Sequence, residues 1–101
     1  MGGLSRTKPS DAEVREVVKS LENEIHIQTC KRLRAATCDS NQVINVIEYK
    51  SQMVSGINFF VKVQRENKIW HLRIWDQPWT KTRKLTDISG PKEEKEDIKY
   101  F

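Results

Sequence analysis

The chain has 101 residues, which is enough for one domain with a modest hydrophobic core and too few for two. Hydrophobic residues make up 37% of it and no apolar run approaches the length of a bilayer span, so we expect a soluble protein without a membrane partner. The 18 Lys and Arg outnumber the 14 Asp and Glu, but no nucleic-acid-binding motif accompanies them, so no nucleic-acid partner is expected.

The first nine residues are predicted to form a flexible arm that contains Gly2 and Gly3, ahead of the rest of a single domain spanning 1–101. The arm has no apolar stretch of the kind found in signal peptides. We therefore expect a cytoplasmic protein, with secretion of a processed form as the alternative.

An amphipathic helix is predicted from Asp11 to Ile27. Ser10 followed by Glu13 matches a capping box, which marks a helix start. Apolar residues then recur at steps of three and four, which gives the helix one apolar face. These residues are Val14, Val17, Val18, Leu21 and Ile25.

The segment Thr29–Asn41 has no clear periodicity and is predicted to be a connection, with a helical turn at Lys31–Ala36. It holds both cysteines, Cys30 and Cys38, whose pairing the sequence leaves open. A metal site that combined them with the two histidines would need an unusual spacing, and no nucleophile context surrounds them. We expect neither a cofactor nor enzymatic activity.

Four strands should provide the surface that the helix covers. These segments are rich in β-branched and aromatic residues, and two of them alternate apolar with polar residues, as in an antiparallel sheet. "REN" at residues 65–67 is predicted to be a tight turn. One helix packed across this sheet is an α+β fold. The predicted strands are Gln42–Lys50, Ile57–Gln64, Lys68–Asp76 and Leu85–Ile88.

The stretch "SQMVSG" joins the first two of these strands and has two apolar residues, Met53 and Val54, near its tip. Hairpin turns usually carry Asn, Asp or Gly instead. Apolar side chains at a solvated tip favour a binding site, whereas burial at the end of a strand is the alternative.

In this order, the motifs resemble those of the cystatin superfamily, and within it the stefins, or type 1 cystatins. "SQMVSG" matches the Q-x-V-x-G loop through Gln52, Val54 and Gly56, and "NFFVKV", "HLRIW" and the final "DIKYF" are similar to stefin segments. Two features differ from the usual stefin: the cysteine-containing connection is longer, and Pro78-Trp79 looks like the second loop of type 2 cystatins.

The resemblance implies a reversible, tight-binding inhibitor whose partners are papain-like cysteine proteases (cathepsins). It would block the active-site cleft with the arm and two hairpin loops, without a catalytic residue or metal of its own. A monomer is expected, with a domain-swapped dimer as the alternative. The protease-binding residues would be Gly2, Gly3, Gln52, Met53, Val54, Ser55, Gly56, Pro78 and Trp79.

Two other functions are alternatives. One is a binding module of the same fold that inhibits no protease, since a fold does not determine a function. The other is a small nucleic-acid-binding protein, whose affinity would fall steeply with salt. It would use the basic residues Lys31, Arg32, Arg34, Lys81, Arg83 and Lys84.

Overall fold

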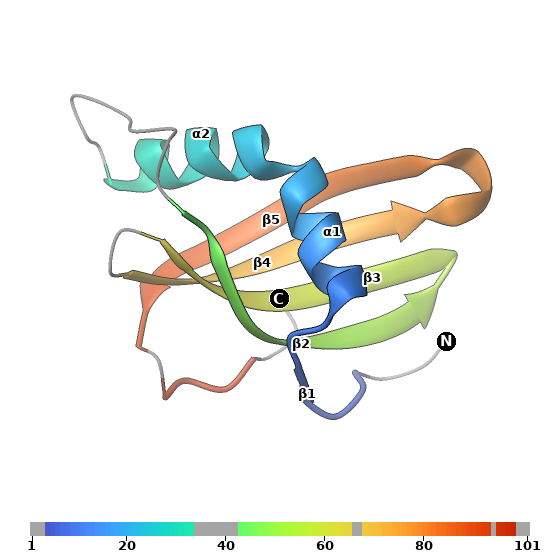
Figure 1. Cartoon of the computed structure of the whole chain (residues 1–101), viewed down its shortest axis with the longest axis horizontal. Coiled ribbons are helices and arrows are strands. Elements are labelled where there is room, and N and C mark those ends of the chain that lie inside the picture. Colours follow the sequence, from blue (N-terminus) through green and yellow to red (C-terminus); the bar gives the residue numbers. More distant parts are fainter. Residues whose placement is uncertain (1–3, 34–42, 66–67, 94, 99–101) are drawn as a thin grey trace.

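The computed structural model describes residues 4–33, 43–65, 68–93 and 95–98. Within these ranges two helices pack against one face of a five-stranded antiparallel sheet, which confirms the predicted α+β fold (Figure 1). The elements in chain order are β1 (Lys8–Pro9), α1 (Ala12–Ser20), α2 (Glu22–Leu33), β2 (Asn45–Val54), β3 (Gly56–Arg65), β4 (Lys68–Gln77), the 3-10 helix η1 (Pro78–Thr80) and β5 (Thr82–Lys92).

The sheet is a meander in the order β1-β2-β3-β4-β5. All four predicted strands are present, and the short β1 pairs with β2 at the edge. β2 begins later than predicted and continues to Val54, and β5 is longer than predicted at both ends. The predicted turn at 65–67 falls largely outside the described residues, since β3 ends at Arg65.

The predicted single helix is two helices that meet at Leu21, whose backbone departs from helical geometry (φ −113°, ψ 18°). The N-cap is Asp11 rather than Ser10, because the Asp11 carboxylate accepts the backbone N–H of Val14 at 2.9 Å. The predicted capping box is therefore wrong.

Most buried hydrophobic residues lie between the helices and one face of the sheet. Because side chains alternate along a strand, Phe60, Lys62 and His71 face the other side, where they are also buried. Ile98, near the end of the described chain, is buried as well. The cluster between helices and sheet includes Val14, Val17, Val18, Ile25, Tyr49, Phe59, Val61, Val63, Trp70, Leu72, Ile74 and Ile88.

α2 continues to Leu33, six residues beyond the predicted helix end, so residues 29–33 are not part of a connection. The periodicity ended early because the helix buries polar residues after Ile25. His26 Nδ1 accepts a 2.7 Å hydrogen bond from Arg65 Nε, and Thr29 Oγ1 donates to the carbonyl of Ile25 at 2.9 Å. These hydrogen bonds within the fold allow both polar residues to occupy buried positions. Neither helix in the described ranges is long and apolar enough to cross a membrane.

Candidate functional site

The tip of the β2–β3 hairpin carries exposed apolar side chains. Ser55 is the one residue between the strands, and Val54 pairs with Gly56 across the turn. The Met53 side chain is 63% exposed and Val54 is partly exposed. The alternative that these residues form a buried strand end is therefore wrong, and the tip presents apolar surface to solvent.

Gly56 permits the tight turn for two reasons. Its φ of +113° lies in a region that L side chains rarely adopt. A Cβ added there would also lie 2.6 Å from the carbonyl oxygen of Asp76, on the neighbouring strand β4. Any other residue at this position would have to displace the backbone of either the tip or β4.

Two side-chain hydrogen bonds fix this hairpin. Asn58 Nδ2 donates to Gln52 Oε1 at 3.2 Å, directly across the β2–β3 pair. Trp75 Nε1, on β4, donates to the carbonyl of Ser55 at 3.0 Å. Sequence reasoning identified Gln52 but placed Trp75 only within a strand, because the contact joins residues that are 20 positions apart.

The second turn presents an exposed aromatic residue. Pro78 begins the 3-10 helix η1, and the Trp79 side chain is 67% exposed. The turn closes with a 3.1 Å hydrogen bond from the Lys81 N–H to the Pro78 carbonyl, and Lys81 has a left-handed backbone (φ 55°). Pro78 and Trp79 therefore form a short turn that presents the Trp side chain to solvent.

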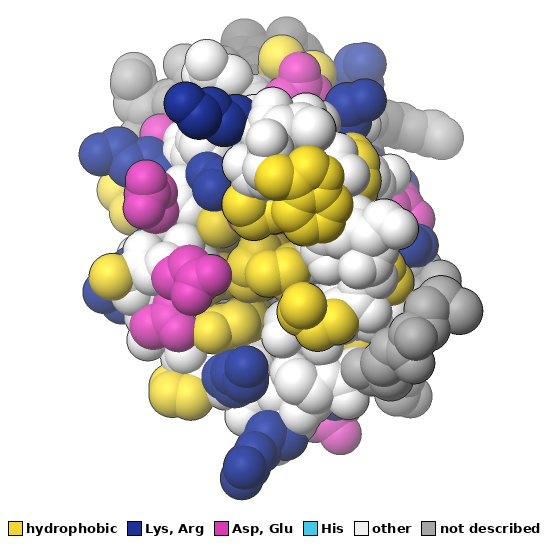
Figure 2. Space-filling view, turned by 90° about the vertical axis from the view of Figure 1, so that its right-hand side faces the viewer, with side chains coloured by type: hydrophobic (Ala, Val, Ile, Leu, Met, Phe, Trp, Pro, Cys, Tyr) yellow, Lys and Arg dark blue, Asp and Glu magenta, His cyan; other side chains and the backbone are white. Residues whose placement is uncertain are grey.

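The two hairpin tips lie at the same end of the sheet. Ile57 pairs with Asp76, and Asp76 pairs with Arg83, so these three residues lie side by side across the sheet. The turn before Ile57 and the turn after Asp76 therefore project from the same end of the sheet. Figure 2 shows this end of the molecule, where hydrophobic side chains gather in the middle and charged side chains lie around them. Met53 and Trp79 thus belong to one surface.

The described part of the arm runs alongside β2. Ser5 N donates to the Ser51 carbonyl at 2.8 Å, and Ser51 N donates to Ser5 Oγ at 3.0 Å. Since Lys8 pairs with Tyr49 in antiparallel fashion, the chain from Lys8 back to Ser5 points toward the β2–β3 tip. Gly2 and Gly3 lie outside the described residues.

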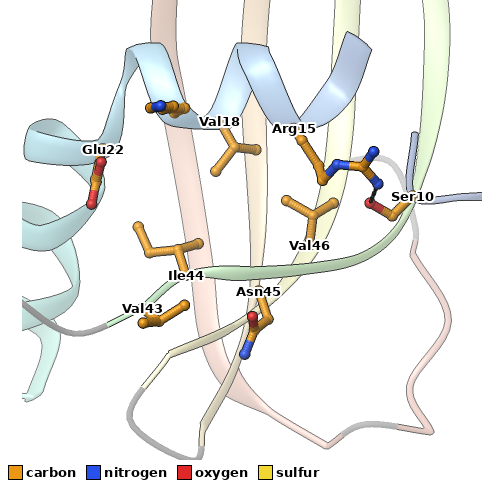
Figure 3. A pocket seen from close by; sticks show the side chains of 9 residues that line it. Ser10, Arg15, Val18, Glu22, Val43, Ile44, Asn45 and Val46 are labelled. Carbon is orange, nitrogen blue, oxygen red and sulfur yellow. Dashed lines mark hydrogen bonds between the residues drawn. The ribbon is translucent and has the colours of Figure 1, made fainter. Parts of the chain in front are cut away.

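One hollow in the described part of the molecule lies away from the hairpin tips. It measures about 500 Å³ and opens between α1 and the start of β2, where Val18, Ile44 and Val46 form apolar walls and Arg15 donates to Ser10 Oγ at 3.3 Å (Figure 3). The length of β2, roughly 30 Å, separates it from the hairpin tips. This hollow is therefore not part of the projecting surface that the hairpin tips form.

The basic residues proposed for nucleic-acid binding are partly paired with acidic ones. Arg83 Nε lies 3.5 Å from Asp76 Oδ1, and Arg32 lies 3.9 Å from Asp87. Arg34 falls outside the described residues. These ion pairs reduce the positive charge available for a phosphate backbone, so the structure does not favour this alternative.

Within the described ranges, no group of three or more His, Cys, Asp and Glu side chains could hold a metal ion. Cys30 is disulfide-bonded, and Arg65 Nη2 lies 3.8 Å from its sulfur. Cys38 lies outside the described residues. Cys30 is on α2, away from both hairpin tips.

Comparisons with known proteins agree with this geometry. The sequence matches the cystatin domain family over residues 2–96. It is 35% identical to Cystatin-A2 of Dictyostelium discoideum over 101 residues, 100% of this chain and 97% of that protein. It is 37% identical to Cystatin-A of Felis catus over 75 residues, 73% of this chain and 68% of that protein. Cystatin-B of Bos taurus is 28% identical over 103 residues, 99% of this chain and 97% of that protein.

Proposed function

Because this chain belongs to the cystatin family of cysteine protease inhibitors, we propose that it is a reversible, tight-binding inhibitor of papain-like proteases such as cathepsins. The similarity to cystatins A and B confirms the predicted stefin, or type 1, subtype. Members of this family are protease inhibitors and not enzymes.

The observation that carries the proposal is the exposure of Met53 and Trp79 on adjacent hairpin tips. Exposed apolar side chains that gather at one end of a protein mark a binding surface, and Trp is among the residue types most enriched at binding hot spots. The two tips form the edge of a wedge that would enter the cleft of the protease.

In this mechanism the β2–β3 tip, Gln52–Gly56, occupies the cleft beside the catalytic Cys and His of the protease. Pro78 and Trp79 cover the primed subsites, and the arm with Gly2 and Gly3 covers the non-primed subsites. The inhibitor presents no scissile bond to the catalytic pair. Access is blocked by a preformed surface, which is how an interface of ordinary size can reach very tight binding.

The tip is suited to this role because its shape is fixed before binding. Gly56 allows the close approach of the tip to β4, and the hydrogen bonds to Gln52 and Ser55 hold it there. A loop that is already ordered loses less conformational entropy when it binds.

We also propose that the protein acts as a monomer in the cytoplasm, where each wedge would engage one protease.

Titration of active papain with the purified protein tests the proposal. Residual peptidase activity should fall stoichiometrically until one inhibitor is present for each active enzyme. A Val54→Asp variant serves as the matched control, since it places a charge on the tip that would be buried without a partner. Full papain activity at micromolar wild-type protein would overturn the proposed function.

A further inference from the structure

Trp75 connects β4 to the tip of the β2–β3 hairpin. Its indole Nε1 donates a 3.0 Å hydrogen bond to the carbonyl of Ser55, the one residue between the two strands. In the sheet Trp75 stands opposite Asn58, so its side chain reaches back along β3 to the turn. The tip is therefore held by a second hairpin as well as by its own strands.

Gly56 leaves room for this contact. A Cβ on residue 56 would lie 3.1 Å from Trp75 Nε1 as well as 2.6 Å from the Asp76 carbonyl oxygen. Val54, Ser55 and Trp75 also line one hollow of about 410 Å³, which places the indole and the apolar tip residue around the same space. The glycine of the Q-x-V-x-G pattern and Trp75 thus act on the same turn.

We propose that Trp75 is a positioning residue for protease binding, which fixes the β2–β3 tip and supplies the hydrogen bond that the Ser55 carbonyl needs inside the cleft. This inference rests on the proposed function. In the free protein Ser55 is exposed, so water can replace the indole as donor. In a desolvated cleft water is excluded, and a carbonyl without a donor is costly.

This reasoning separates binding from stability. Loss of the indole donor should leave the free protein nearly as stable, because solvent satisfies the carbonyl. It should weaken the complex about tenfold, in the range expected for one unsatisfied buried carbonyl. The loss should appear mainly as faster dissociation of the complex.

The test compares Trp75→Phe with Trp70→Phe. Both variants keep an aromatic ring and lose an indole N–H. Trp70 is fully buried in the core, and its Nε1 has no hydrogen-bond partner among the described residues. Trp70→Phe should therefore lower the melting temperature and leave the inhibition constant for papain unchanged. Trp75→Phe should leave the melting temperature nearly unchanged and raise the inhibition constant for papain about tenfold.

Hydrogen exchange of the indole protons gives an independent readout on the free protein. The Nε1 proton of Trp75 should exchange more slowly than that of the exposed Trp79, and equal rates would overturn the inference. If the wild type inhibits papain and Trp75→Phe has the same inhibition constant, the role of Trp75 is overturned and the proposed function stands. A wild-type protein that does not inhibit papain would overturn both.

Discussion

The hydroxyl group of Tyr49 donates a 2.7 Å hydrogen bond to Asp11 Oδ2, while Asp11 Oδ1 accepts the Val14 N–H that caps α1. One carboxylate thus joins the start of the helix to strand β2. The Val14 N–H and then the Tyr49 hydroxyl hold the pKa of Asp11 below its usual value. The Asp11 carboxylate, followed by burial, raises the pKa of Tyr49 to about 12.

Asp11→Ala should lower the free energy of unfolding by about 1–3 kcal/mol at pH 7, because it removes both the cap and the tie to β2. The pKa of Asp11 is lowered in the folded state, so its contribution is present above the unfolded pKa near 3.8 and is lost as pH falls below it. Urea unfolding at pH 7 and pH 2 measures this. Ser10→Ala is the control, and an equal loss in both variants would contradict the assignment of the cap.

The helix start shows what sequence reasoning could and could not reach. Ser10 and Asp11 are both good N-cap residues, and the pattern of Ser10 with Glu13 favoured the wrong one. The choice depends on Tyr49, which is 38 residues away and draws the Asp11 carboxylate toward the sheet. Periodicity along the chain carries no information about such a partner.

The same limit applies to the rest of the molecule. The four longer strands and the tip residues Met53 and Val54 follow from local patterns, so they could be predicted, whereas the two-residue β1 was missed. The end of α2 could not, because its buried His26 is satisfied by Arg65 from β3. Trp75 was also missed as a site residue, since its contact with Ser55 depends on the register of neighbouring strands.

Buried His71 should make the protein less stable as the pH falls from about 6.5 to about 4. Burial, with Lys92 and Lys62 nearby, lowers its pKa from 6.5 to about 4, and Glu96 and Glu48 oppose this shift. Because the folded pKa lies below the unfolded one, the unfolded chain binds the proton first. The loss should be on the order of 2–3 kcal/mol.

His71→Gln removes the titrating group and should flatten this dependence. Unfolding by urea at several pH values between 7 and 4 measures the free energy of both proteins. The difference between the two slopes is the readout, so a general loss of stability in the variant does not affect the result. An identical slope in both proteins would show that folding does not lower the pKa of His71.

Gly56→Ala should weaken papain inhibition by more than tenfold. The new Cβ would lie 2.6 Å from the Asp76 carbonyl oxygen, and the residue would keep a positive φ that costs about 1–3 kcal/mol. The tip must shift to relieve the contact, which displaces Met53 and Val54. Inhibition constants measure the effect. Ser55→Ala is the control, because it changes the neighbouring side chain and leaves Gly56 in place. Equal inhibition constants for wild type and Gly56→Ala would show that inhibition does not depend on the shape of the tip.

Trp79→Ala should weaken binding by about 1–4 kcal/mol, mainly through faster dissociation. The side chain is 67% exposed in the free protein, so its removal should change the melting temperature little. Stopped-flow kinetics with papain and a thermal melt separate the two effects. A variant that melts earlier and keeps its affinity would assign Trp79 to the core instead of the binding surface.

Deletion of residues 1–4 should weaken inhibition by tenfold or more, while Ser5→Ala should have a smaller effect in the same direction. The deletion removes the part of the arm that would enter the non-primed subsites, including Gly2 and Gly3. Ser5→Ala keeps those residues but loses the side-chain oxygen that accepts the Ser51 N–H, so the arm is held less firmly along β2.

The deletion therefore tests the contacts of the arm with the protease, and Ser5→Ala tests how firmly the arm is held along β2. Since the Ser5 N–H still donates to the Ser51 carbonyl in Ser5→Ala, the arm keeps one of its two hydrogen bonds to that residue. Inhibition constants for the three proteins should rank wild type as the tightest, then Ser5→Ala, then the deletion. The deletion should matter most for proteases whose cleft is partly blocked, because there the arm supplies a larger share of the contact. Equal constants for all three would mean that the arm stays outside the cleft and the two hairpin tips alone carry the inhibition.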